Sequence, residues 1–146
     1  MLSHTFLVLQ QVQPLAQWLQ EALGFALVKQ ACEGHYLELR VPAITESSPP
    51  SPADTGHVLA LTTATVMQQF AGFAPPLYQG GCLLSLRYPS LHALTKATQR
   101  AQANQALVLQ PLTTQPWGQA TLMLSPPQAV LSTQLLLELN CPTGNA

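Results

Sequence analysis

The segment HYLELRV places an unusual combination of side chains on one side of a predicted strand. Side chains alternate between the two faces of a strand, so Tyr36, Glu38 and Arg40 share one face while Leu37 and Leu39 occupy the other. An aromatic ring beside a guanidinium group can bind a planar, anionic molecule, because the ring stacks and the guanidinium donates charge-assisted hydrogen bonds. The alternative is a solvated face on which Glu38 and Arg40 only neutralise each other.

The other chemically active residues do not form a recognisable catalytic set. His35, His57 and His92 are dispersed, and no serine lies in a Gly-x-Ser-x-Gly turn. Gly80-Gly81 lacks the further glycines and the lysine of a phosphate-binding loop. The carboxylates show no pairing suited to acid–base chemistry: Glu21, Glu33, Glu38, Glu46, Asp54 and Glu138. The sequence therefore leaves enzymatic activity open and favours a protein that is not an enzyme.

Composition limits the class of protein and its partners. The chain has 146 residues, of which 47% are hydrophobic, and this predicts one compact domain, residues 1–146, with an ordinary core. Charged residues make up only 8% and the formal net charge is −1, so neither nucleic acid nor a membrane surface is an expected partner. Without a signal-peptide pattern or a long apolar run, we expect a cytoplasmic protein. Three separated cysteines, Cys32, Cys82 and Cys141, favour reduced thiols.

Hydrophobic periodicity predicts a βαβββ unit over residues 3–63. HTFLVLQ alternates as a strand, and Pro14 then opens a helix with a stripe of apolar residues that includes Trp18 and ends before Gly24. The segments FALVKQ, HYLELRV and GHVLALTT follow as strands, the first two joined by a short turn at residues 32–34. A Pro/Ser-rich surface loop, PAITESSPPSPADT, separates the last two.

The same order repeats over residues 81–139. GCLLSLRY reads as a strand, Ser90 as a helix cap, and Leu94 lies in the apolar stripe of the helix. QALVLQP, WGQATLML and a strand within AVLSTQLLLELN complete the unit, and residues 64–80 connect the two halves. We therefore predict an α+β fold in which two βαβββ modules form a curved mixed β-sheet. The helices should lie outside the sheet, with Trp18 and Leu94 in the core.

Two sequence features carry a resemblance to a known family. The first helix ends in WLQEALGF, and a Trp117-Gly118 pair precedes the penultimate strand of the paired modules. The chain thereby resembles the vicinal oxygen chelate superfamily, which comprises glyoxalases, bleomycin-resistance proteins and extradiol dioxygenases. One departure is the turn Ser125-Pro126-Pro127-Gln128, where the family carries Asp-Pro-Asp-Gly. The resemblance spans nearly the whole chain and implies a ligand cleft on the concave face of the sheet.

The resemblance also implies positions for metal ligands, and the residue types at these positions indicate whether this chain could bind a metal. His4 falls on the first position and has a suitable side chain, whereas Ala60 stands where the family has glutamate. Cys82 or its neighbour falls on the third position, and the last is Ser132 or, with an insertion in the turn, Glu138. Catalytic metal sites usually need three or more protein ligands. We therefore expect no cofactor; a divalent metal held by His4, Cys82 and Glu138 is the alternative.

These observations predict a metal-free, small-molecule-binding protein of the glyoxalase/bleomycin-resistance type. Its cleft is expected to be lined by Phe6, Tyr36, Glu38, Arg40 and Trp117, with His4 at the edge. The alternatives are a lyase or dioxygenase with a degenerate metal site using His4 and Glu138, and an interaction protein without a ligand. The resemblance and the low surface charge further predict a homodimer. The expected interface material is Phe70, Phe73, Leu77 and Tyr78.

Overall fold

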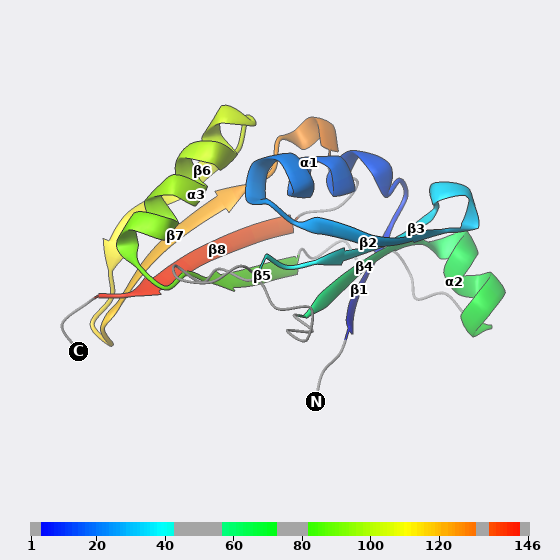
Figure 1. Cartoon of the computed structure of the whole chain (residues 1–146), viewed down its shortest axis with the longest axis horizontal. Helices are drawn as coiled ribbons and strands as arrows, with labels where there is room; N and C mark the ends of the chain where they lie inside the picture. Colours follow the sequence, from blue (N-terminus) through cyan, green and yellow to red (C-terminus); the bar gives the residue numbers. More distant parts are fainter. Residues whose placement is uncertain (1–3, 43–56, 73–81, 131–134, 144–146) are drawn as a thin grey trace.

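The computed structural model of the chain describes residues 4–42, 57–72, 82–130 and 135–143 (Figure 1). Its strands form two four-stranded sheets, and helices α1 (Gln13–Leu23) and α3 (Leu91–Ala103) lie together on one side of them. Each sheet contains one parallel and two antiparallel strand pairs. The predicted α+β fold with two βαβββ modules is therefore confirmed, with the strands divided between two mixed sheets.

The first module follows the predicted order. Its strands are β1 (His4–Leu9), β2 (Ala26–Ala31), β3 (Tyr36–Arg40) and β4 (Val58–Thr63). They lie in the order β1-β4-β3-β2, with β1 parallel to β4. A short turn of helix, η1 (Cys32–Gly34), joins β2 to β3, and helix α2 (Ala64–Ala71) follows β4 directly. Thr63 caps α2 by accepting a hydrogen bond from the Val66 amide through its side chain.

The second module repeats this arrangement. Its strands are β5 (Cys82–Arg87), β6 (Leu107–Thr114), β7 (Gln119–Ser125) and β8 (Leu135–Pro142), and a short helical turn, η2 (Gln128–Val130), follows β7. The order β5-β8-β7-β6 repeats that of the first sheet strand for strand. The predicted cap is present, because the Ser90 side chain accepts a hydrogen bond from the Ala93 amide at 3.1 Å. Strands β6 and β8 both run beyond their predicted ends.

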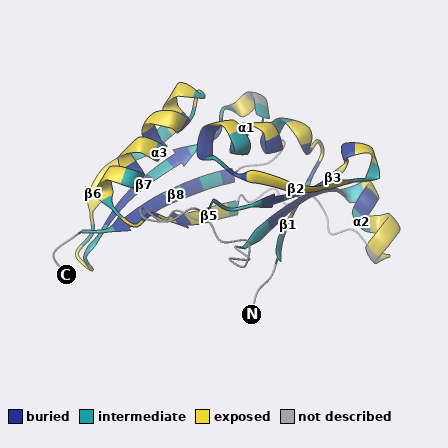
Figure 2. Ribbon diagram, viewed as in Figure 1, coloured by how far each residue is buried: buried dark blue, intermediate teal, exposed yellow. Residues whose placement is uncertain are grey.

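A shared hydrophobic core joins the two modules beneath the helices. Trp18 of α1 and Leu94 of α3 are both buried in it, as expected. The strands contribute alternate residues from both sheets, among them Leu7, Leu39 and Leu137. Figure 2 shows the resulting pattern, with buried residues along the strands below the helices and exposed ones on the outer helix surfaces and on β2. In β1 and β3 buried residues alternate with less buried ones, and the less buried set forms the opposite sheet face.

The structure describes only part of the segments that the sequence analysis predicts as loops and connector. The predicted connector begins with α2, and Phe70 lies on this helix. Phe73, Leu77 and Tyr78, which were expected in an interface, lie outside the described residues, as does Ser132. None of the helices in the described part of the chain is both long and apolar enough to span a bilayer.

Candidate ligand-binding site

The face of the first sheet that is turned away from α1 carries the predicted site residues; we call it the open face. Strand register orders it in three rows, each running from β1 through β4 to β3. The rows are Val8, Thr62 and Tyr36; Phe6, Ala60 and Glu38; and His4, Val58 and Arg40. The strand alternation seen in the sequence thus brings Phe6, Tyr36 and Glu38 onto one surface.

A carboxylate at the middle of the open face links its neighbours. The Tyr36 hydroxyl donates a hydrogen bond to Glu38 Oε1 at 2.7 Å. The imidazole Nε2 of His4 lies 3.8 Å from the same oxygen, and the His4 ring stacks on Phe6 with a centroid separation of 6.1 Å. Burial, followed by the hydrogen bond to Glu38 and the charges of Glu38 and Cys32, raises the pKa of Tyr36 to about 12. Tyr36 therefore stays protonated at neutral pH and acts as a donor.

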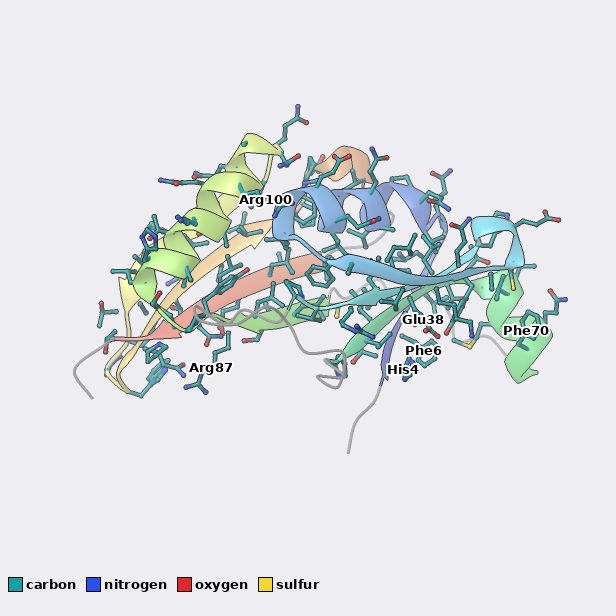
Figure 3. The ribbon with its side chains drawn as sticks, in the orientation of Figure 1. His4, Phe6, Glu38, Phe70, Arg87 and Arg100 are labelled. Carbon is teal, nitrogen blue, oxygen red and sulfur yellow. The ribbon has the colours of Figure 1, made fainter. Side chains whose placement is uncertain are left out.

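Next to this carboxylate lies a pocket of about 500 Å³, which we call the ring pocket. Its described lining is almost entirely apolar and comes from β1, β3, β4 and α2: Phe6, Tyr36, Thr62, Val66, Met67 and Phe70. Phe6 and Phe70 are 48% and 70% exposed, so their rings are available to a ligand. Figure 3 shows Phe6 close to His4 and Glu38 beneath the sheet, with Phe70 projecting from α2 at the sheet's end.

The α2 side of this pocket was missed by the sequence analysis. Residues 64–80 were assigned to a connector, so Val66 and Met67 were not considered as lining. The signal was present, because Thr63 before ATVMQQF has the form of a capped, partly apolar helix. What could not be inferred is that this helix would pack against the ends of β1 and β4 and close one side of the pocket.

Two predicted site residues lie away from the ring pocket. Arg40 is at the far end of β3, two rows from Tyr36, and its buried Nε atom has no hydrogen-bond partner within the described residues. Trp117 is 70% exposed in the turn between β6 and β7. That turn lies at the opposite end of the molecule from α2 (Figure 1). The structure therefore brings together His4, Phe6, Tyr36 and Glu38 but not Trp117.

The corresponding face of the second sheet carries a polar cluster. Ser85 donates a hydrogen bond to Glu138 Oε1 at 3.0 Å, and the Asn140 amide donates to the same oxygen at 3.1 Å and to the Ser85 hydroxyl at 2.9 Å. Ser85 and Glu138 face each other across β5 and β8. Cys82 belongs to the opposite face of β5, where it packs against the core, and burial raises the pKa of its thiol.

The four positions that the resemblance assigns to metal ligands do not form a donor set for a divalent metal ion within the described part of the chain. Ala60 has no donor atom, the Cys82 thiol is turned away from Glu138, and a thiol with a raised pKa is a poor ligand because metal binding requires the thiolate. Across the described residues, no three His, Cys, Asp or Glu side chains gather in a group that could hold a metal ion. Glu138, and not Cys82, shares its face with the other polar groups of the second sheet.

Comparison with known proteins agrees with the fold. Residues 1–128 match the family model described as the Glyoxalase/Bleomycin resistance protein/Dioxygenase superfamily. The chain therefore belongs to this superfamily. No curated protein matches the chain.

Several solved structures share the fold. A glyoxalase/bleomycin resistance protein/dioxygenase family enzyme from Burkholderia phytofirmans PsJN is 13% identical, with a TM-score of 0.68 and coverage of 97% of this chain and 98% of its own. A glyoxalase-related enzyme from Fulvimarina pelagi is 16% identical, with a TM-score of 0.68 and coverage of 97% and 87%. TioX from Micromonospora sp. ML1 is 16% identical, with a TM-score of 0.66 and coverage of 97% and 98%. At these identities the likeness shows the fold alone.

Proposed function

We propose that this protein is a metal-free, small-molecule-binding member of the superfamily that holds the planar part of its ligand in the ring pocket. The observation that carries the proposal is the pocket itself: about 500 Å³, with apolar walls and the hydrogen-bonded pair Tyr36–Glu38 at its side. Small-molecule sites typically measure 300 to 1,000 Å³ and combine apolar walls with a few polar groups that orient the ligand.

The chemistry of the lining favours binding over catalysis. Phe6 and Phe70 offer aromatic faces against which a planar ring can stack. The Tyr36 hydroxyl stays protonated at neutral pH because its pKa is raised to about 12. It donates a hydrogen bond to the Glu38 carboxylate. Neither group is paired with a nucleophile in the described lining. These residues therefore hold and orient a ligand.

Binding to purified protein tests this proposal directly. A fluorescence or thermal-shift screen of planar aromatic metabolites should yield binders whose affinity falls roughly three- to tenfold in Phe6→Ala, because a stacked aromatic contact is lost. Phe6 is half-exposed, so the variant should fold normally. Leu112→Ala is the matched control, an exposed apolar residue on β6 of the other sheet. The site is wrong if binders keep full affinity in both Phe6→Ala and Tyr36→Ala.

The competing function is a lyase or dioxygenase with a metal bound by His4 and Glu138. The observation in its favour is that Glu138 lies on the open side of β8 opposite Ser85. We expect protein purified without chelator to contain well below one equivalent of zinc, nickel, iron or manganese per chain, because Ala60 leaves the donor set incomplete. Elemental analysis measures this. Close to one equivalent, lost in both His4→Ala and Glu138→Gln, would establish the competing function instead.

A further inference from the structure

A second pocket adjoins the ring pocket at the same end of the first sheet. It measures about 600 Å³ and lies between the turn η1, the ends of β1 and β4, and helix α2; we call it the turn pocket. Val66 and Phe70 line both pockets. These two residues are four apart on α2 and so lie on one face of the helix. A ligand held against that face is therefore in reach of both pockets.

Other contacts also show that the two pockets are neighbours. Thr62 lines the ring pocket and Thr63, the next residue of β4, lines the turn pocket. Cys32 of the turn pocket is close enough to Tyr36 of the ring pocket to contribute to the raised pKa of its hydroxyl. The turn pocket thus adjoins the proposed site where β4 ends and α2 begins.

The chemistry of the turn pocket differs from that of the ring pocket. Its described lining includes one carboxylate, Glu33, together with the hydrogen-bonding side chains of Gln10, His35, Thr65 and Gln69. Neither lysine nor arginine occurs in this described lining. Amide, hydroxyl and carboxylate oxygens are all acceptors, and the carboxylate adds a negative charge. Such a surface favours a group that is both a hydrogen-bond donor and a cation.

The turn that presents Glu33 is held in an unfavourable backbone conformation. Cys32 and Glu33 have φ angles of 54° and 56°, in the left-handed region that residues with a Cβ atom rarely occupy, and Gly34 follows at 85°. The turn is held by hydrogen bonds from the Gln13 side chain to the Gly34 carbonyl and from the His35 amide to the Cys32 carbonyl, at 3.2 and 3.0 Å. Strain of this kind persists where surrounding structure fixes it, and it is concentrated at functional sites.

We infer that the turn pocket binds the ammonium group of an amine whose aromatic ring occupies the ring pocket, with Glu33 as the counter-ion. This inference rests on the proposed function and names the ligand class, an arylalkylamine, whose amino group is protonated at neutral pH. It differs from the sequence-based expectation of an anion beside Arg40, because Arg40 lies at the other end of β3 and Glu33 lies in the pocket wall.

Two probes of the same shape and opposite charge test the inference. Naphthylethylamine and naphthylacetate are titrated into the intact protein by calorimetry. We expect the amine to bind about two- to fivefold more tightly, the effect of one solvent-exposed charge pair. Glu33→Gln should abolish this preference without weakening naphthylacetate. Glu33→Asn should do the same while keeping the turn, because asparagine tolerates left-handed φ better than most residues. Glu21→Gln, an exposed carboxylate change on α1, is the matched control.

The outcomes separate this inference from the function on which it rests. Amine binding that is weakened in Phe6→Ala but unchanged in both Glu33 variants would overturn the inference and leave the proposed function in place. Tighter binding of naphthylacetate, weakened by Arg40→Leu, would also overturn it. Failure of both probes and of the wider aromatic screen to bind would overturn the proposed function as well. Loss of the amine preference in both Glu33 variants, with Glu21→Gln unchanged, would support the inference.

Discussion

Glu38 is the residue on which the proposed site depends most. It accepts a hydrogen bond from Tyr36 and faces His4 at 3.8 Å, so one carboxylate orients groups from β1 and β3. Ala60, between Phe6 and Glu38 in the same row, leaves this carboxylate reachable from β1 because its side chain is a single methyl group. A larger residue at position 60 would separate His4 from Glu38.

Tyrosine ionisation predicts how stability depends on pH. The pKa values of Tyr36 and Tyr88 are raised from 10.0 to about 12, in both cases mainly by burial. A group whose pKa is higher in the folded state contributes stability that is complete below its unfolded value and is lost as pH rises through the folded one. We therefore expect the free energy of unfolding to fall between about pH 10 and 12 for this reason.

Urea unfolding and absorbance titration of tyrosinate measure this dependence. Tyr36→Phe should make the decline with pH shallower and remove one late-titrating tyrosine, and Tyr88→Phe should do the same independently. Tyr88 is the useful comparison, because it is buried in the core and does not line the ring pocket. Titration of all tyrosines near 10, with no late phase, would contradict the prediction.

At the scale of elements, the two modules are joined where α1 meets α3. Arg100 of α3 donates hydrogen bonds from Nε to the Glu21 carbonyl and from Nη2 to the Gln20 carbonyl, at 2.6 and 3.2 Å. The last carbonyls of α1 carry partial negative charge, so a guanidinium is favourably placed there; the Gln20 carbonyl also accepts a hydrogen bond from the Gly24 amide. The indole of Trp18 donates to the Asn104 carbonyl at 2.8 Å, across 86 positions in the sequence.

Substitutions at this junction should reduce stability without altering ligand binding. Arg100→Ala is expected to lower the free energy of unfolding by about 0.5–1 kcal/mol, since Arg100 is exposed and its hydrogen bonds compete with water. Trp18→Phe should cost about 1–3 kcal/mol, because it leaves a part-buried carbonyl unpaired and reduces core packing. Urea unfolding followed by circular dichroism measures both. Lys96→Ala, an exposed change on α3, is the control, and equal losses in all three variants would contradict the prediction.

At the scale of the whole molecule, α1 and α3 cover one side of the sheets, and several apolar side chains are exposed to solvent elsewhere. Phe6 and Leu83 are exposed on β1 and β5, Phe70 on α2, and Leu107 on β6. Larger exposed apolar surfaces on soluble proteins commonly mark binding or association sites. We propose that a second copy of the chain covers part of this surface in a homodimer.

Light scattering at micromolar concentration tests the homodimer. We expect twice the chain mass for the wild type. Phe70→Glu should shift the equilibrium toward monomer, because it places a charge in the expected interface. Leu112→Glu, an exposed apolar position on β6, is the matched control and should leave the mass unchanged. A monomeric wild type at this concentration would refute the homodimer, and dissociation by Leu112→Glu alone would move the interface to β6.

Local patterns in the sequence determined the elements and their faces. Period-two alternation in HYLELRV is a consequence of strand geometry, so it correctly placed Tyr36 and Glu38 together. Gly24 ends α1 with a φ of 75°, and Ser90 caps α3, because both signals act within a few residues. The repeated order of strands and helix likewise predicted two modules, and the family followed from that order.

Long-range packing decided what the sequence could not. Whether Cys82 or Ser85 shares a face with Glu138 depends on the register of β5 against β8, which no local pattern specifies. Strand alternation and the family resemblance predicted that Arg40 and Trp117 lie beside Tyr36. Their actual distances from the ring pocket depend on where each strand ends and on how the two sheets are arranged in space. The pocket itself exists because α2 packs at the end of the first sheet, bringing Val66 and Phe70 next to Phe6 and Tyr36. Contacts of this kind form between segments distant in the chain, so only the tertiary structure determines them.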